Sequence, residues 1–369
     1  MAGTSPPFRA EHIGSLLRPR TLHAAFKRLS AGEIDAAAYT AAVDQAIRDV
    51  VRLQEDAGLQ VVTDGEFRRA SYWSHFVEAV DGFSVKTSAF KFHDAEGHDH
   101  EFVAPYVERP VRRGRPISGG EFDFLKSVTT RTPKITMPSP PTMHFWRGRD
   151  SLAPGSYGDE EAFFADLAAV YRAEIADLAR RGARYIQIDE VPLAMLCDGG
   201  VRGVIAGRGN DPARLTGRYV KLINECVAGT PPEVTLGLHL CRGNFKGRWL
   251  SEGGYDSVAE VMFGETNVKA FFLEYDNERA GTFAPLRFLP RHKHAVLGIV
   301  TTKSPLLEEA DALKRRIDEA ATFAPLDNLA VSPQCGFSST IGGNPITVDD
   351  ERRKLDLVVR VARDVWGSA

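Results

Sequence analysis

The sequence predicts an α/β fold, a (β/α)8 TIM barrel with a long insertion after its second strand. Three observations favour this fold. Eight short, mostly apolar runs occur in order, and most are followed by a stretch with helical apolar spacing. Polar and charged residues gather directly after these runs, where such barrels carry their active sites. The 369 residues, 43% hydrophobic and 26% charged, suit one large globular unit, so we expect residues 1–369 to form a single domain.

The eight runs are the expected barrel strands, and the segments between them are the expected helices. The runs end near Ile13, Thr63, Met137, Ile188, Leu240, Glu274, Val300 and Ser332. Helices are expected over 39–57, 159–181, 211–227, 305–323 and 348–365, where apolar residues recur every three or four positions and charged residues occupy the opposite face.

The connection between the second and third runs, about 71–133, is too long for a simple loop. It holds many aromatic residues among charges and glycines, so we expect an inserted lid or β-hairpin over the barrel mouth. Within it, His93, His98 and His100 could bind a second metal, although a solvated polar turn explains them better.

Composition excludes several classes of partner. The net charge is −3 and no stripe of Lys and Arg interleaves with aromatic residues, so neither nucleic acid nor a membrane surface is an expected partner. No stretch resembles a signal peptide or a membrane span, and four cysteines are too few for a disulfide framework. We expect a cytoplasmic protein that acts on small molecules, with a homo-oligomer left open.

Four residues are typical of a site for Zn²⁺. His239, Cys241, Glu274 and Cys335 each lie at or just past the end of an apolar run. Zinc accepts imidazole, thiolate and carboxylate together, and ligands drawn from three separate strand ends indicate a pre-built catalytic site. His239 and Cys241 alternate along one strand, so both side chains are expected to point toward the barrel axis.

The ligand types also indicate the reaction. A zinc ion with two thiolates and a carboxylate suits the binding of another thiol, which it keeps as the nucleophilic thiolate. Glu66 and Asp189 could then bind the ammonium of a thiol-containing amino acid, while backbone amides around Gly14 and Ser15 take its carboxylate. Lys303 could protonate or neutralise the leaving group. His12 and Glu190 also follow apolar runs and are further candidates.

Seven motifs carry a family resemblance. In order and spacing, the chain resembles the catalytic half of cobalamin-independent methionine synthase, and more closely the short single-barrel relatives in the uroporphyrinogen decarboxylase-like superfamily. The motifs are "HIGSLLRP", "TDGEFRR", "PSPPTMHFW", "IQIDE", "HLC", "LEYD" and "SPQCGF", and they cover nearly the whole chain. The resemblance implies a zinc-dependent barrel methyltransferase that activates homocysteine and produces methionine.

The resemblance also implies roles for individual residues. Zinc would be bound by His239, Cys241, Glu274 and Cys335. Ile13 and Ser15 would hold the carboxylate of homocysteine, Glu66 and Asp189 would hold its amino group, and Trp146 falls where the family stacks the folate ring.

The methyl donor stays open at this point. Met195 replaces a glutamate that the family uses at the pterin, and Lys303 replaces its acid-catalytic histidine. The donor could be a methylated folate or a methyl-corrinoid protein.

Two alternatives remain for the function. One is alkyl transfer to another thiol, as in epoxyalkane:coenzyme M transferase, for which Arg18, Arg242 and Lys303 could bind a sulfonate. The other is a non-catalytic zinc or thiol-metabolite binding paralogue, suggested by Met195 and Lys303.

Overall fold

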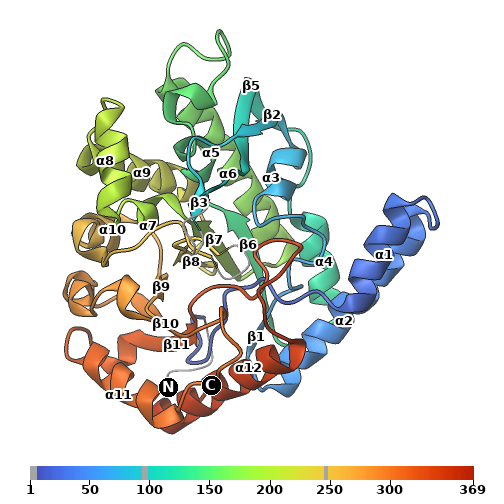
Figure 1. Ribbon diagram of the computed structural model, residues 1–369, viewed down its shortest axis with the longest axis vertical. Coiled ribbons are helices and arrows are strands. Elements are labelled where there is room, and N and C mark those ends of the chain that lie inside the picture. The colour runs from blue at the N-terminus through green and yellow to red at the C-terminus, as the bar shows by residue number, and fades with distance from the viewer. Residues whose placement is uncertain (1–5, 94–98, 245–247) are drawn as a thin grey trace.

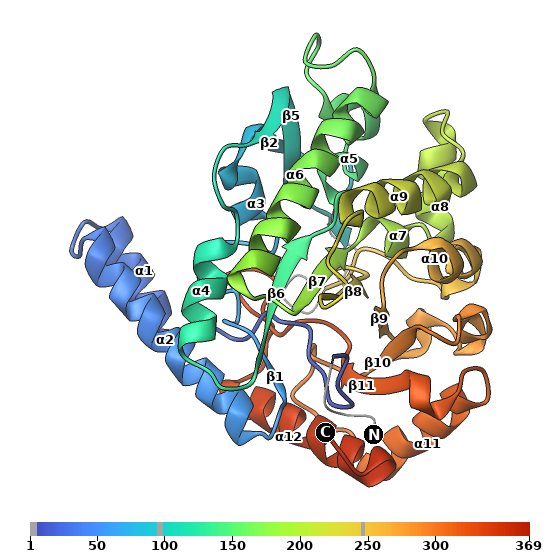
Figure 2. The same ribbon diagram turned by 180° about the vertical axis from the view of Figure 1, so that it is seen from behind.

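Seven parallel strands form the central sheet of the protein. The computed structural model describes residues 6–93, 99–244 and 248–369. The strands lie side by side in chain order, and the sheet curls so that its edges approach each other (Figures 1 and 2). They are β1 (Val61–Val62), β6 (Thr132–Pro138), β7 (Tyr185–Glu190), β8 (Thr235–Leu240), β9 (Ala270–Glu274), β10 (His294–Val300) and β11 (Leu329–Pro333).

The N-terminal segment closes this sheet into a barrel. Ala10 forms a parallel bridge with Val331 of β11, and the Glu11 amide donates to the Val331 carbonyl over 2.9 Å. On its other side the segment meets the end of β1, where the Thr63 hydroxyl donates to the Gly14 carbonyl over 2.6 Å. The segment therefore occupies the eighth strand position, and the TIM-barrel prediction is confirmed as a fold class.

Helices cover the outside of the barrel (Figures 1 and 2). The longer ones confirm four expected ranges to within a few residues. They are α2 (Ala36–Asp56), α6 (Glu160–Arg181), α9 (Pro212–Val227) and α12 (Val348–Trp366). Local capping explains such ends: the Asp159 carboxylate accepts the Ala162 amide where α6 begins, and Gly182 adopts a φ of 101° where it stops.

One expected helix starts late. The 305–323 prediction corresponds to α11 (Ala310–Ala321). The residues before it are held by other partners: the Glu308 carboxylate accepts the Thr301 amide over 2.7 Å and pairs with Lys354 over 3.0 Å. Helical spacing in the sequence does not reveal these long-range contacts. Two shorter helices are α10 (Ala259–Glu265) and α1 (Arg20–Ser30), which lies beside α2 (Figure 1).

Residues 71–133 contain several elements. They are α3 (Ser74–Ala79), β2 (Val80–Thr87), β3 (Phe92–His93), β4 (Asp99–His100), β5 (Val103–Arg113) and α4 (Gly119–Ser127). β2 and β5 form an antiparallel hairpin that stands apart from the barrel sheet (Figure 1). Three histidines of this segment could bind a second metal according to the sequence. His98 lies outside the described residues, and the side chains of His93 and His100 are likewise not described.

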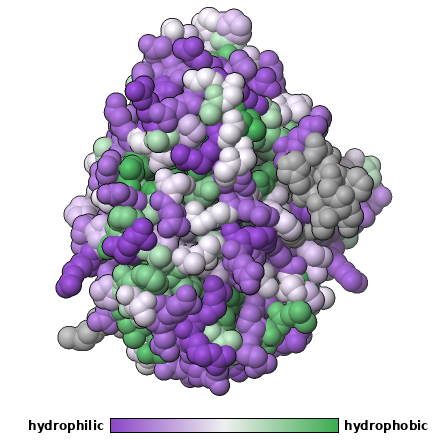
Figure 3. Space-filling view, turned by 60° about the vertical axis from the view of Figure 1, so that its left-hand side comes forward, coloured by the Kyte–Doolittle hydropathy of each residue, from purple (hydrophilic) through white to green (hydrophobic). Residues whose placement is uncertain are grey.

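Apolar residues lie mainly in the core and polar residues mainly on the surface. Apolar side chains fill the barrel and the layer beneath the helices, whereas the face in Figure 3 is mostly hydrophilic with smaller hydrophobic patches. None of the helices in the described ranges is both long and apolar enough to cross a bilayer.

Candidate metal and thiol site

A cavity of about 460 Å³ opens at the carboxyl ends of the barrel strands. Its floor comes from strand ends and its cover comes from the segment around α3 and β5. Most of the residues predicted to form the site line this one cavity: Ile13, Ser15, Glu66, Trp146, Asp189, His239, Cys241 and Cys335. The alignment of parallel strands explains the convergence, because Asp189 and His239 are register partners in β7 and β8.

Three soft donor atoms meet on the cavity floor. The ligand atoms of His239, Cys241 and Cys335 all lie within 4.8 Å of one another, and the two sulfurs are 3.3 Å apart. All three residues are buried. Neither ring nitrogen of His239 has a hydrogen-bond partner among the described residues. Burying an imidazole without a hydrogen-bond partner costs free energy unless a ligand binds it. The imidazole and the two neighbouring thiols therefore fit a zinc ion.

The thiols influence each other's protonation. The Cys241 thiol and the His239 imidazole hold the pKa of the Cys335 thiol well below its usual range. A thiolate at this position is the form that ligates metal.

Glu274, the fourth expected ligand, stands just outside this group. It ends β9, next to the end of β8, and its Oε2 accepts the Arg242 amide over 3.1 Å. Its Oε1 accepts from Lys303 Nζ over 3.0 Å; the glutamate is buried and the lysine largely so. Although burial opposes ionisation, Lys303 and Arg242 keep the pKa of Glu274 below its ordinary value. The carboxylate is therefore charged beside the three donors.

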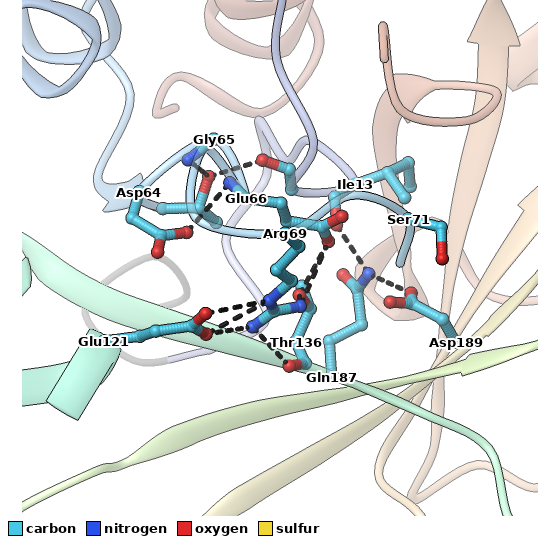
Figure 4. A network of polar contacts seen from close by, with 12 residues as sticks. Ile13, Asp64, Gly65, Glu66, Arg69, Ser71, Glu121, Thr136, Gln187 and Asp189 are labelled. Atoms are coloured by element: carbon cyan, nitrogen blue, oxygen red, sulfur yellow. Dashed lines mark hydrogen bonds and ion pairs between the residues drawn. The ribbon is translucent and has the colours of Figure 1, made fainter. Parts of the chain in front are cut away.

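Glu66 faces the cavity from a strained backbone. Its φ is 62°, and no other described non-glycine residue has a positive φ. The conformation is held by the Asp64 carboxylate, which accepts the Glu66 amide over 2.9 Å, and by the Thr136 hydroxyl, which donates to Glu66 Oε1 over 2.7 Å. Figure 4 shows Arg69 between Glu66 and Glu121. Such strain persists where surrounding contacts fix it, commonly at functional sites.

Asp189 lies across the cavity from Glu66. Burial, and then the charge of Glu66, raise the pKa of Asp189 to about 7. Its Oδ1 accepts from Gln187 Nε2 over 2.7 Å, and the same nitrogen donates to the Ile13 carbonyl (Figure 4). Two buried carboxylates that repel each other are stabilised by a cation placed between them.

Ile13 and Ser15 belong to the segment that closes the barrel. The Ser15 carbonyl accepts the Phe337 amide over 2.9 Å, which ties this segment to the loop after β11. Gly336 in that loop has no room for a side chain, because a Cβ there would lie 1.9 Å from Ser15 Oγ. The segment and the Cys335 loop are therefore packed directly together.

Trp146, which directly follows α5 (Thr142–Phe145), lines the cavity. It is only 3% exposed and packs edge to face on Phe102, with ring centroids 5.2 Å apart. Its Nε1 has no partner among the residues described.

The remaining predicted residues are not among those lining the cavity. Arg18 donates to the Glu66, Arg69 and Ser338 carbonyls and so fastens two loops together. His12 is buried below the floor, where burial and Lys134 depress the pKa of its imidazole. Glu190 accepts the Leu193 amide over 2.7 Å, and burial raises the pKa of its carboxyl to about 7. Lys303 pairs with Glu274, and its charge also interacts with the Cys335 thiol.

Sequence reasoning missed several residues that shape the site. Gln187 alternates with Asp189 in "IQIDE", so the period of two along a strand could have identified it. No comparable signal marks Arg69 and Thr136, which hold Glu66, or Tyr72 and Trp73, which line the cavity from the cover.

Known proteins resemble this chain over most of its length. A family model described as the catalytic domain of cobalamin-independent synthase matches residues 8–363. The uncharacterized protein YxjH of Bacillus subtilis is 38% identical over 98% of this chain and 95% of its own length. A protein named methionine synthase from Pyrococcus furiosus is 28% identical over 88% of this chain and 85% of its own.

A solved structure shares the whole fold. The putative vitamin-B12 independent methionine synthase from Listeria monocytogenes superposes with a TM-score of 0.78 at 32% identity, covering 99% of this chain and 100% of that one.

Proposed function

The chain belongs to the family of cobalamin-independent synthase catalytic domains, and from this premise we propose that it is a zinc-dependent methyltransferase that methylates homocysteine to methionine. One observation supports this proposal most. Three zinc-type donors and two carboxylates, drawn from distant parts of the chain, line the same cavity.

In this proposal His239, Cys241 and Cys335 hold the metal, with Glu274 as the neighbouring carboxylate. Bound zinc would lower the pKa of an incoming thiol and keep it as a thiolate at neutral pH. Lys303 acts as a positioning residue, because its ion pair keeps Glu274 ionised and in place.

The protein's other residues select an amino acid. Glu66 and Asp189 bind the ammonium, whose positive charge relieves the repulsion between the two carboxylates. The segment at Ile13 and Ser15 binds the carboxylate. Homocysteine matches this arrangement, since its thiol lies at the opposite end from both charged groups.

Methyl transfer then needs mainly proximity and exclusion of water. The substrate thiolate attacks the donor's methyl carbon in line, forming an S–C bond as the donor's bond to that carbon breaks. Trp146 and the cover formed around α3 and β5 keep solvent from the thiolate.

The alternative of a coenzyme M-type reaction has less support. A sulfonated thiol needs cationic residues at the mouth, yet no Lys or Arg lines the cavity in the described part of the chain. Arg242, one of the candidates, places its guanidinium on the Gly253 carbonyl and over the Tyr255 ring instead.

The proposal is tested by metal content together with methionine formation. We expect stoichiometric zinc, and we expect Cys335→Ser to lose both zinc and activity. Cys226→Ser removes another buried thiol, in α9 and away from the cavity, and is expected to keep both. Full activity after complete chelation would contradict the proposal.

A further inference from the structure

Glu66, the carboxylate that binds the substrate's ammonium in the proposed function, belongs to a cluster of charged side chains. We call it the Arg69 cluster, and its members are Arg18, Asp64, Glu66, Arg69 and Glu121. Four of them are buried, and the Glu121 side chain is only 10% exposed. Of the five, Glu66 alone lines the cavity. The other four are set back from a ligand, and their charges determine how much of the Glu66 charge stays available to it.

The Arg69 guanidinium is shared unequally between two carboxylates. Its Nη2 and Nε donate to Glu121 Oε2 over 2.6 and 3.1 Å, whereas its Nη1 lies 3.6 Å from Glu66 Oε1 (Figure 4). Nη1 instead donates to the Thr136 hydroxyl over 2.7 Å, and that hydroxyl donates on to Glu66 Oε1 over 2.7 Å. The closer, bidentate ion pair is therefore the one with Glu121, and such pairs are the stronger ones.

Glu121 reaches the cluster from the first turn of α4, in the segment inserted after the second predicted strand. Burial raises the pKa of its carboxyl, and Arg69 opposes this rise. Although burial disfavours the charged form of the guanidinium, Glu121 and then Glu66 raise the pKa of Arg69. Arg69 is therefore charged, and Glu121 is its principal counter-ion.

The Arg69 cluster holds three carboxylates and two guanidiniums. The charge of Arg18 interacts with those of Glu66 and Asp64. The charge of Arg69 interacts with those of Glu121 and Glu66. One negative charge is thus left over beside the cavity, where it attracts a cation. A neutral residue in place of Glu121 would make the cluster neutral and would leave Arg69 with Glu66 as its nearest counter-ion.

We propose that Glu121 is a positioning residue for the amino-acid substrate: it engages the Arg69 guanidinium, so that Glu66 keeps its negative charge for the substrate's ammonium. This inference rests on the proposed function and adds a residue to its recognition of homocysteine. The inserted segment thereby contributes to the choice of substrate without touching it. The effect acts through a buried region, where water and salt screen charges weakly.

The test compares two thiols that differ only in the ammonium. Homocysteine and 4-mercaptobutanoate share the thiol, the carboxylate and the carbon chain between them. Calorimetry at pH 8, above the pKa of about 7 of Asp189, measures the Kd of each for the zinc-loaded protein. The ratio of the two Kd values is the preference for homocysteine, and it isolates the contribution of the ammonium.

The preference for homocysteine should fall in Glu121→Gln. We expect a loss of roughly three- to tenfold, the effect of one unit charge several ångströms away at an effective dielectric constant of about 20. The variant should bind 4-mercaptobutanoate at least as tightly as the parent does, because that ligand has no ammonium to lose an attraction. A purely structural role of Glu121 would weaken both ligands.

Three further variants separate charge from structure. Glu121→Asp keeps the charge and should keep most of the preference. Asp123→Asn removes another carboxylate of α4, one that pairs with Arg181 at the surface, and should change neither Kd. Arg69→Gln/Glu121→Gln removes the ion pair as a unit and restores the net charge of the Arg69 cluster, so its preference should approach that of the parent. This double variant also gives a result if Glu121→Gln does not fold.

The outcomes distinguish this inference from the proposed function. Equal weakening of both thiols in Glu121→Gln, an unchanged preference in that variant, or a lost preference in Arg69→Gln/Glu121→Gln would overturn the role of Glu121. Each of these results leaves the proposed function standing. A parent protein that binds neither thiol, or that does not prefer homocysteine, would instead contradict the proposed function and this inference together.

Discussion

Lys303 Nζ donates to Glu274 Oε1 over 3.0 Å, and this buried ion pair stands beside the three donors of the proposed metal site. Each partner neutralises the other where little of either side chain is exposed to water. In the proposed function the lysine serves the site by keeping this carboxylate ionised and in place.

Removing this lysine should destabilise the metal-free protein. Lys303→Met leaves the buried Glu274 carboxylate without its ion-pair partner, with the Arg242 charge still nearby, and should cost up to about 3–5 kcal/mol in the free energy of unfolding. The measurement is urea denaturation after chelation. Lys303→Met/Glu274→Gln should recover much of the loss, and Lys314→Met, in an exposed pair with Asp311, should change little. Equal stability of Lys303→Met and the parent would refute the pairing.

Homocysteine binding should depend on the protonation of Asp189. Burial and Glu66 raise the pKa of this carboxyl to about 7. Below that pH it becomes neutral and no longer attracts the ammonium, so kcat/KM for homocysteine should fall as pH drops from 8 to 6, by up to about tenfold per unit for one proton. In Asp189→Asn this part of the pH dependence should vanish. If the pH profile of Asp189→Asn matched that of the parent, Asp189 would not be the group whose protonation controls homocysteine binding.

Gln187 should act by positioning Asp189. Its amide donates to both the Ile13 carbonyl and Asp189 Oδ1, and the second hydrogen bond lowers the pKa of the carboxyl. In Gln187→Leu the midpoint of the pH profile for homocysteine should therefore move upward, whereas a purely structural role would lower activity equally at every pH. In Gln187→Asn, which keeps an amide, the midpoint of the pH profile should lie between those of the parent and of Gln187→Leu.

The contact of Gly336 with Ser15 should tolerate no extra methyl group. Gly336→Ala would put a Cβ 1.9 Å from Ser15 Oγ and should cost about 1–3 kcal/mol of stability, with a raised KM for homocysteine. Ser15→Ala/Gly336→Ala removes the clashing hydroxyl and should restore part of the stability. Thermal unfolding compares them, and a Gly336→Ala protein as stable as the parent would contradict the packing described.

Much of the fold could be predicted because each strand and helix carries its own period. The eight apolar runs coincide with the barrel strands, even at the first position, where a bridge at Ala10 joins the segment to β11. The start of α11 could not be predicted, because Glu308 is held by Thr301 and Lys354 from elsewhere in the chain. Local spacing contains no information about such partners.

The site was predictable as a set of residue types at strand ends, but its contacts were not. His239, Cys241 and Cys335 converge as the parallel topology requires. No sequence pattern indicated that Lys303 would pair with Glu274, or that Arg18 would donate to backbone carbonyls. Both depend on side-chain directions in loops, which have no periodic signal.

The central claim is that His239, Cys241 and Cys335 bind a zinc ion that receives the substrate's thiol. Zinc X-ray absorption of the purified protein, recorded before and after homocysteine is added, tests it most directly. We expect one zinc per chain with two sulfur neighbours, and three once homocysteine is bound. A sulfur count that stays unchanged on saturation with homocysteine, or a fully active protein without zinc, would contradict the account.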